Sequence, residues 1–305
     1  MILCVGEILV DMIGETNDNV FSYQRRAGGA PFNVSCAIAK FYGQSGFIGN
    51  VGEDIIGKYL CDYASTQGLK YLNISIDKKH NTTLAFVDID ETGERNFCFY
   101  RKNTADYHLK MLTNKEIKKA SIIHVGSLML SEDKGTAYID KLIEKVKTNK
   151  KYLSFDINFR TDIFKDKEEA LMRYKKILPK FDILKFSEDE VEIFTYEYIK
   201  SLANNTLICI SLGSKGSRYI YKDLDNIVPS IKVQPIDTTG AGDAFFAGVL
   251  SQLDLLDKSS WDASVLNKAF EFGNIAGALN TLGKGAIDNL PTYEIITNYM
   301  EKKTW

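Results

Sequence analysis

The stretch IDTTGAGDAFFAG, residues 236–248, combines a glycine-rich turn, two acids and the start of a helix. Apolar residues recur after the turn at the three-and-four spacing of one helical face, namely Phe245, Phe246, Val249, Leu250, Leu253 and Leu256. We expect Gly240, Ala241 and Gly242 to form the first turn of this helix, with Asp243 inside it. A helix start offers unpaired N–H groups and a positive dipole end, and glycine lets that backbone approach a phosphate. The stretch therefore predicts an anion site beside a carboxylate.

Asp243 at such a turn stands where it can take a proton from a hydroxyl that attacks a bound phosphoryl group. The motif by itself also fits a tight strand-to-helix turn in which Asp243 is only a favourable charge. The sequence contains no GxxxxGK[ST], and Phe245 occupies the place where the dinucleotide fingerprint needs its third small residue. Phosphoryl transfer therefore needs support from the rest of the chain.

The composition is that of an ordinary globular protein. The chain has 305 residues, of which 45% are apolar and 26% charged, enough for one large α/β domain or two small ones. The formal net charge of −2 provides no basic field for nucleic acid or an anionic membrane. We expect small-molecule partners, and neither nucleic acid nor a membrane.

The cysteines and histidines predict neither disulfides nor a zinc site. His80, His108 and His124 lie far apart and form no metal-ligand spacing. The cysteines are odd in number, lack a CxxC pair and lie among apolar neighbours, so we expect buried thiols in a reducing compartment; they are Cys4, Cys36, Cys61, Cys98 and Cys209.

The N-terminal run MILCVGEILVDMIG carries Glu7 and Asp11 among its apolar residues and has no basic start, unlike a signal peptide. We expect a first strand there instead. No stretch approaches the roughly 18 to 20 uninterrupted apolar residues of a membrane span. The expectation is a cytoplasmic protein.

A second glycine pair precedes a helix in AGGAPFNVS, residues 27–35. Pro31 suits a first helical position, and the apolar face continues until Gly43. Gly28 and Gly29 fit a packing turn as well as a ligand site. Asn33 favours the ligand site, because its amide can both donate to and accept from a hydroxylated ligand.

Residues 82–101, TTLAFVDIDETGERNFCFYR, predict a hairpin, because two alternating β-rich arms flank a turn at residues 90–93. Inserted in a series of βα units, this hairpin is expected in a separate small sheet or lid. Its second arm ends in Phe99, Tyr100 and Arg101, which offer aromatic faces and a guanidinium to a ligand. An edge strand with a solvated arginine fits the same residues.

From residue 121 strands and helices alternate, with strands expected at 121–126, 152–157, 182–186 and 206–212 and helices at 134–147, 168–178 and 187–196. This order predicts a parallel sheet covered on both faces, which binds ligands beyond the carboxyl ends of its strands. Polar residues or glycines stand at those ends: Asp156, Asn158, Arg160, Lys185, Ser187, Glu190, Ser211, Gly213 and Gly216.

With AGGAPFNVS near its start and DTTGAGDAFFAG near its end, the chain resembles the ribokinase-like, or PfkB-type, carbohydrate kinases over its whole length. The resemblance implies a three-layer α/β fold, in which helices flank a central, mostly parallel sheet and a small β-sheet forms a lid. It implies one kinase domain over residues 1–305, with lid segments at about 12–25 and 82–103. It also implies transfer of the ATP γ-phosphate to a sugar, sugar acid or nucleoside hydroxyl with Mg²⁺, and a homodimer formed through the lid.

The resemblance also implies roles for individual residues. Asp243 is the expected catalytic base, and the anion hole is expected at Gly240, Ala241 and Gly242. Substrate contacts are expected from Asp11, Gly28, Gly29, Asn33, Arg101 and Arg160. ATP contacts are expected from Lys185, Ser187, Glu190, Ser211, Gly213, Gly216 and Asn274.

Metal ions complete the implied site. Glu190 is expected to hold Mg²⁺ through water, and Asp237 and Thr239 match a monovalent-cation site, which leaves K⁺ open as a further cofactor. Many family members have Asn where this chain has Ser187, a shorter side chain.

Only the resemblance narrows the choice of acceptor substrate. FYRKNTAD, GSLML, SFDINFR and GKGAIDNLPT are most similar to the fructokinase branch, so D-fructose is the expected acceptor. 2-Keto-3-deoxygluconate kinases share the YR element and the DxNxR pattern, and there Arg101 and Arg160 would pair with the substrate carboxylate. Ribose and adenosine fit less well. A sugar-binding protein without turnover is the alternative from another class, although Asp243 and the GAG turn are intact.

Overall fold

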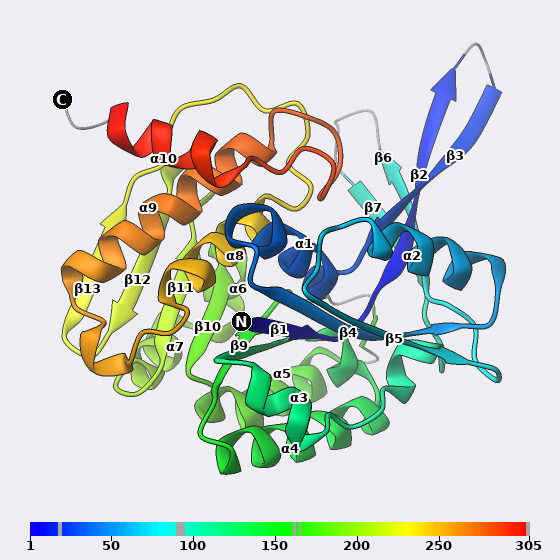
Figure 1. The fold of residues 1–305 in the computed structure, drawn as a ribbon, viewed down its shortest axis with the longest axis horizontal. Coiled ribbons are helices and arrows are strands. Elements are labelled where there is room, and N and C mark those ends of the chain that lie inside the picture. The colour runs from blue at the N-terminus through cyan, green and yellow to red at the C-terminus, as the bar shows by residue number, and fades with distance from the viewer. Residues whose placement is uncertain (18–19, 90–94, 161–162, 165, 303–305) are drawn as a thin grey trace.

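Strand β1 (Ile2–Val5) lies in the interior of a nine-stranded sheet and is buried on both faces. Its side chains alternate, so that Ile2 and Cys4 pack into one apolar cluster while Leu3 and Val5 pack into another. A strand that is covered on both faces reads as an uninterrupted apolar run. The computed structural model describes residues 1–17, 20–89, 95–160, 163–164 and 166–302 (Figure 1).

The large sheet is parallel except at one edge. From that edge its strands are β13 (Leu224–Val228), β12 (Ser217–Tyr221), β11 (Leu207–Ser211), β10 (Ile183–Ser187), β9 (Tyr152–Asp156), β8 (Ile122–Val125), β1, β4 (Ser45–Gly52) and β5 (Tyr71–Asp77). All neighbours from β11 to β5 are parallel, and β12 and β13 are antiparallel. The carboxyl ends of the parallel strands therefore share one edge.

Helices cover both faces of this sheet (Figure 1). One face carries α1 (Ala30–Tyr42), α2 (Ile55–Ser65), α8 (Ala241–Leu253), α9 (Ala263–Asn280) and α10 (Tyr293–Lys302). The other carries α3 (Asn114–Lys119), α4 (Asp133–Thr148), α5 (Lys167–Ile177), α6 (Glu188–Phe194) and α7 (Tyr196–Leu202). Short 3₁₀ turns complete the chain: η1 (Ala105–His108), η2 (Leu128–Ser131), η4 (Leu178–Lys180), η5 (Gly213–Lys215) and η6 (Lys258–Ser260).

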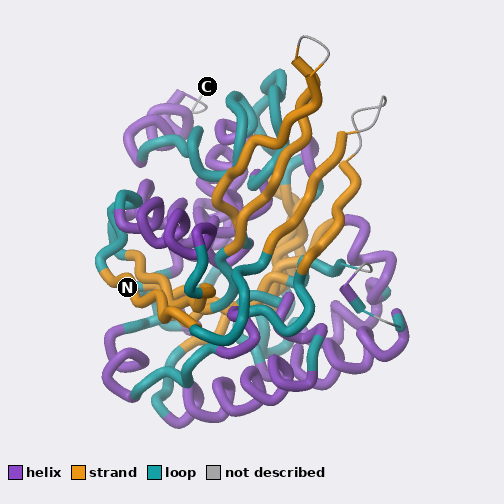
Figure 2. Tube along the Cα trace, turned by 90° about the vertical axis from the view of Figure 1, so that its right-hand side faces the viewer, coloured by secondary structure: helices purple, strands orange, loops and turns teal. Residues whose placement is uncertain are grey.

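A separate small sheet projects from this body (Figure 2). Its order is β3-β2-β6-β7, and its strands are β2 (Leu9–Asn17), β3 (Val20–Gly28), β6 (Leu84–Ile89) and β7 (Arg95–Tyr100). The two outer pairs are antiparallel, and β2 runs parallel to β6. The three-layer fold with a second, smaller sheet is thus confirmed; the predicted hairpin turn at residues 90–93 lies outside the described residues.

The N-terminal run is not one strand. The chain leaves the large sheet after Val5 and enters the small sheet at Leu9. Gly6 turns with a φ of 154°, and a Cβ there would lie 2.7 Å from Pro31 Cγ, so glycine is required where the chain changes sheets. The prediction was wrong because hydrophobic periodicity does not register a change of sheet.

Other departures are local. The predicted helix at 187–196 ends at Phe194, because Thr195 has a φ of 67° and its hydroxyl caps α7. Cys98 is exposed and Cys61 partly buried, so the expectation of five buried thiols holds only for Cys4, Cys36 and Cys209. The rings of His80 and His108 stack with centroids 3.6 Å apart, although their sequence positions show no relation. Within the described ranges, every helix is too short or too polar to cross a membrane.

Candidate active site

The first turns of α1 and α8 meet through their polar side chains. Asn33 Nδ2 donates a hydrogen bond to Asp243 Oδ2 at 2.8 Å, which joins the two glycine-containing motifs across 210 residues. Gly240 stands before α8 with a φ of 73°, and a Cβ there would lie 2.6 Å from Ala286 Cα. Only glycine fits such a position, so the chain turns sharply enough to aim the helix start at this site.

A cavity of about 230 Å³, here the small cavity, opens at this point. It is lined by Leu9, Asp11, Gly29, Ala30, Asn33, Phe99, Leu128, Asp156, Asn158, Arg160, Lys185, Thr239, Gly240, Gly242 and Asp243. One wall is apolar and is formed by Leu9, Phe99 and Leu128, of which the first two belong to the small sheet. A sugar has both C–H faces and hydroxyls, and a pocket with one apolar wall and convergent polar groups suits it.

The surroundings of Asp243 raise the pKa of its carboxyl and so favour its acceptance of a proton. Desolvation by the surrounding protein raises the pKa of its carboxyl to about 6, and the negative charge of Asp156 acts in the same direction. The Lys185 cation and the hydrogen bond from Asn33 act in the opposite direction. A carboxyl with a pKa near 6 is ionised at pH 7 and is a stronger base than an ordinary aspartate.

Lys185 brings a cation to the start of α8. Its Nζ lies 2.8 Å from both oxygens of Asp156, and a Cβ on Gly242 would lie 3.3 Å from Nζ. Burial lowers the pKa of the ammonium, but Asp156 and the other nearby carboxylates outweigh this and raise it above the usual range. The lysine is therefore charged at neutral pH and is available to an anion beside the α8 N-terminus.

Asp156 and Asn158 line the small cavity, although the sequence analysis assigned neither a role. Asp156 is the last residue of β9 and Asn158 lies two residues beyond it, and SFDINFR identified them only as polar strand-end residues. The same segment had already pointed to the ligand site, because its Arg160 was predicted to contact the substrate. What the sequence does not show is the ion pair with Lys185, which depends on the parallel pairing of β9 with β10.

Arg101 does not line the small cavity. Its Nε donates to Asp106 Oδ2 at 2.9 Å and its Nη1 to the Leu128 carbonyl at 2.6 Å, and only 5% of the residue is exposed. It borders a second, larger cavity of about 1,320 Å³ between β7, η2 and α5. The predicted substrate contact by Arg101 stays a prediction.

Gly28, another predicted substrate residue, is also absent from the lining of the small cavity. A Cβ at this position would lie 2.4 Å from Asp11 Oδ2, so glycine leaves room for the Asp11 carboxylate.

Apart from Lys185, which lines the small cavity, the residues predicted to bind ATP lie outside that lining. Ser187 and Ser211 are paired across β10 and β11. Gly213 and Gly216, with φ of 57° and 109°, form the turn into β12. Asn274 Nδ2 donates to the Val228 carbonyl at 2.8 Å and so anchors the segment that leads to the 236–248 stretch. The carboxyl edge of the large sheet thus runs from Lys185 in β10 through Ser211 in β11 to the turn at Gly213 and Gly216.

Glu190 and Ser187 form a reciprocal cap at the start of α6. Glu190 Oε2 accepts from Ser187 N at 2.7 Å, and Glu190 N donates to Ser187 Oγ at 3.2 Å. Glu190 Oε1 accepts from Phe159 N at 2.6 Å, which holds the loop after β9. The Ser187 side chain is thus used in capping α6.

Asp237 and Thr239 order the loop that precedes α8. Asp237 Oδ1 accepts from Thr239 N at 2.8 Å and Oγ1 at 2.6 Å, and Asp237 Oδ2 accepts from Gly285 N at 2.8 Å. Asn280 Nδ2 donates to the Thr239 carbonyl at 3.2 Å. The loop presents a carboxylate and backbone carbonyls, which are the ligands that hard cations prefer.

Comparison with known proteins accounts for this arrangement. Residues 1–293 match the model of the pfkB family carbohydrate kinases. Fructokinase-1 of Zea mays is 33% identical over 317 aligned positions, covering 99% of this chain and 98% of that protein. Fructokinase of Xylella fastidiosa with bound ATP superposes with a TM-score of 0.89 at 25% identity, covering 100% and 99% of the two chains. Fructokinase of Vibrio cholerae O395 with fructose, ADP and calcium gives a TM-score of 0.84 at 29% identity, covering 98% of each. The chain therefore belongs to the pfkB family of carbohydrate kinases.

Proposed function

We propose that this kinase transfers the γ-phosphate of ATP to a hydroxyl of D-fructose. The observation that carries the proposal is the position of Asp243, which lies in the small cavity, is held by Asn33 and stands at the start of α8 beside Lys185. The related fructokinases named above support fructose as acceptor. The small cavity, at about 230 Å³, lies below the roughly 300 Å³ at which pockets for drug-sized ligands begin. A monosaccharide is an occupant of the right scale.

In the proposed mechanism a sugar hydroxyl lies within reach of Asp243, which takes its proton as the oxygen attacks phosphorus. The backbone N–H groups of Gly240 and Gly242 face the transferring phosphoryl group, and Lys185 neutralises part of its charge. The N–H of Ala241, also predicted for the anion hole, donates instead to the Thr238 carbonyl at 3.2 Å, and Ala241 does not line the small cavity. Asp11 accepts hydrogen bonds from the other hydroxyls, Asn33 donates to them or accepts from them, and Arg160 lines the same cavity. Phe99, in the predicted lid segment at about 82–103, and Leu9, three residues before the segment at about 12–25, exclude water. The two segments act as a lid on one catalytic domain.

Metal ions have a place in this proposal. Each oxygen of Glu190 accepts one backbone N–H and keeps a further lone pair, so the carboxylate fits a water-mediated contact with Mg²⁺. Magnesium would neutralise charge on the ATP phosphates. Asp237 and the carbonyl of Thr239 fit a monovalent cation such as K⁺, which would fix the loop before α8.

The acceptor is tested by ATP consumption in the presence of Mg²⁺ and K⁺, with D-fructose, 2-keto-3-deoxygluconate, ribose and adenosine offered separately. We expect the highest kcat/KM with fructose. A preference for the keto acid would replace the fructose proposal, because Arg160 then pairs with a carboxylate. Measurable sugar binding without turnover on any acceptor would reject catalysis. Omission of K⁺ tests the monovalent site in the same assay.

We also propose a homodimer through the outer face of the small sheet. Four rings form a continuous row there, with centroids 5.0 Å apart for Phe21 and Tyr23, 4.9 Å for Tyr23 and Phe86, and 5.3 Å for Phe86 and Tyr100. Phe21 is 56% and Tyr100 61% exposed. Exposed aromatic rows of this kind favour association. Light scattering should give a dimer mass for the wild type and a monomer mass for Tyr100→Lys; a monomeric wild type would reject the interface.

A cytoplasmic location is proposed as well. All five cysteines are free thiols, which accords with a reducing compartment.

A further inference from the structure

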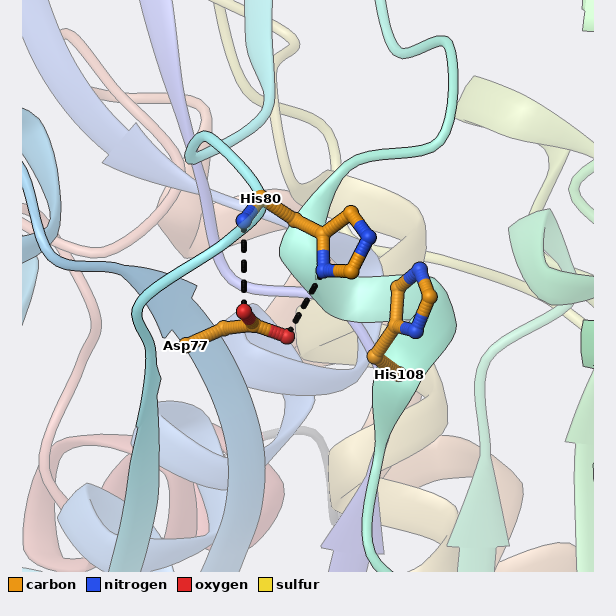
Figure 3. A group of neighbouring side chains, drawn as sticks. All are labelled: Asp77, His80 and His108. Atoms are coloured by element: carbon orange, nitrogen blue, oxygen red, sulfur yellow. Dashed lines mark hydrogen bonds and ion pairs between the residues drawn. The ribbon is translucent and has the colours of Figure 1, made fainter.

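Asp77, His80 and His108 form a compact group (Figure 3), in which Asp77 ends β5, His80 lies between β5 and β6, and His108 ends η1. Each offers one ligand atom, and these atoms all lie within 4.8 Å of one another. All three residues are partly buried, so their side chains are accessible from solvent without being free to spread apart. The group lies apart from the small cavity, since none of its members lines that cavity.

The Asp77 carboxylate is held in position by the turn that follows β5. Its Oδ1 accepts from the backbone N–H of Lys79 at 2.7 Å and of His80 at 3.2 Å, and its Oδ2 lies 2.9 Å from His80 Nδ1. The group thus supplies a fixed anionic oxygen next to an imidazole.

His108 reaches the same point from η1. Its Nε2 lies 3.0 Å from Asn103 Oδ1, which orients the ring, and its ring plane is within 15° of that of His80. Stacking of two imidazoles keeps both near the carboxylate. Two histidines and a carboxylate from separate segments are therefore assembled by the fold, and the ring orientation is set by a neighbouring polar side chain, as is common at metal sites.

We propose that Asp77, His80 and His108 bind a divalent transition-metal ion of the zinc type. Imidazole nitrogens with one carboxylate oxygen, and water in the remaining position, are a ligand set that Zn²⁺ accepts at about 2.0 to 2.2 Å. Ligand atoms around such an ion lie closer together than 4.8 Å, so small side-chain rotations must close the group. When the ion takes the place of the proton on His80 Nδ1, that proton moves to Nε2 of the same ring, so the imidazole stays neutral.

The ion would join the two connections that carry the hairpin of β6 and β7. His80 lies in the segment that enters β6, and His108 lies in the turn that follows β7. These connections are already joined by Ala105 N donating to the Asn81 carbonyl at 2.9 Å and by Thr83 Oγ1 donating to Thr104 Oγ1 at 2.7 Å. A metal bridge adds a stronger link at the root of the hairpin, whose Phe99 lines the small cavity. The bound ion should therefore restrain the hairpin.

Calorimetric titration of Zn²⁺ into tag-free, nucleotide-free protein tests the site. A Cys98→Ser background removes the exposed thiol, which would otherwise bind zinc. We expect one site per chain. Asp77→Asn and a His80→Gln, His108→Gln double variant should lose that site, whereas Asp62→Asn, the same change at an exposed carboxylate, should keep it. Co²⁺ offers an independent readout, because its visible absorption reports nitrogen and oxygen ligation.

Hydrogen exchange measures the effect on the hairpin. Amides of Leu84 to Val87 and of Cys98 to Tyr100 should exchange more slowly with Zn²⁺ than without it, and this difference should disappear in Asp77→Asn. Absence of a one-site isotherm in the Cys98→Ser protein would overturn the proposal. Equal zinc binding by the double histidine variant, shown to be folded by its circular dichroism, would overturn it as well.

Discussion

Lys185 Nζ lies 2.8 Å from each oxygen of the Asp156 carboxylate, and this buried ion pair stands beside the first turn of α8. The two charges have opposite effects on Asp243, because Asp156 raises the pKa of its carboxyl while Lys185 lowers it. Desolvation is the largest cause of the raised pKa of Asp243, and the ion pair modifies it while also supplying the charge that faces the phosphates.

Asp156→Asn should shift the acid limb of activity to lower pH. The substitution removes a negative charge that raises the pKa of Asp243, so this pKa should fall below about 6. Asp243 then stays ionised in more acidic solution. The measurement is kcat/KM for the sugar from pH 4.5 to 8, with Asp62→Asn as the control at an exposed site. An acid limb that stays in place or moves to higher pH would contradict this account.

Asp243→Ala should reduce kcat by about 10² to 10⁴, the range for loss of a general base, with sugar binding largely retained. Asp243→Asn is the matched companion, because its amide keeps a polar partner for Asn33 but accepts no proton. Both variants should show similar kcat, measured at saturating ATP and sugar. Turnover near the wild-type value in either variant would remove Asp243 from the role of base.

Much of the fold was predictable because the core strands and helices carry clear periodic patterns. Glycine pairs ahead of apolar helices also located α1 and α8, and thus Asn33 and Asp243. Strand β12 and the edge strand β13 were missed because each spans only five residues and shows no strict alternation of apolar and polar side chains. Long-range side-chain partners were missed for a different reason: Asp156 pairs with Lys185, and His108 stacks on His80, only through tertiary contacts.

Gly240→Ala should destabilise the protein more than the same change at Gly68. Both glycines have a left-handed backbone, with φ of 73° and 69°, for which alanine costs about 1 to 2 kcal/mol. A Cβ on Gly240 would also lie 2.6 Å from Ala286 Cα, whereas a Cβ on Gly68 meets nothing within 4 Å. The difference in melting temperature isolates this contact. Gly240→Ala should also lower kcat/KM, because the start of α8 is displaced. Equal melting temperatures of the two variants would contradict this prediction and would show that the loop at Ala286 can move away from the new Cβ at little cost.

Glu7→Gln should stabilise the protein in alkaline solution relative to the wild type. Glu7 is fully buried, and neither carboxylate oxygen accepts a hydrogen bond from another described residue. Desolvation raises its pKa from 4.5 to about 7, although the Arg101 charge opposes this. The folded state therefore holds the proton more tightly than the unfolded state, and the corresponding stability, fully present below about pH 4.5, is lost as the pH rises through 7.

Glutamine does not titrate, so the variant avoids this loss of up to about 3 kcal/mol. Urea unfolding at pH 5 and pH 8 measures it, and the stability of Glu7→Gln minus that of the wild type should increase between the two. Glu53→Gln, at an exposed carboxylate, should show no such increase. A difference that is the same at both pH values would mean that Glu7 is ionised in the folded protein across this range, with the Arg101 charge outweighing desolvation.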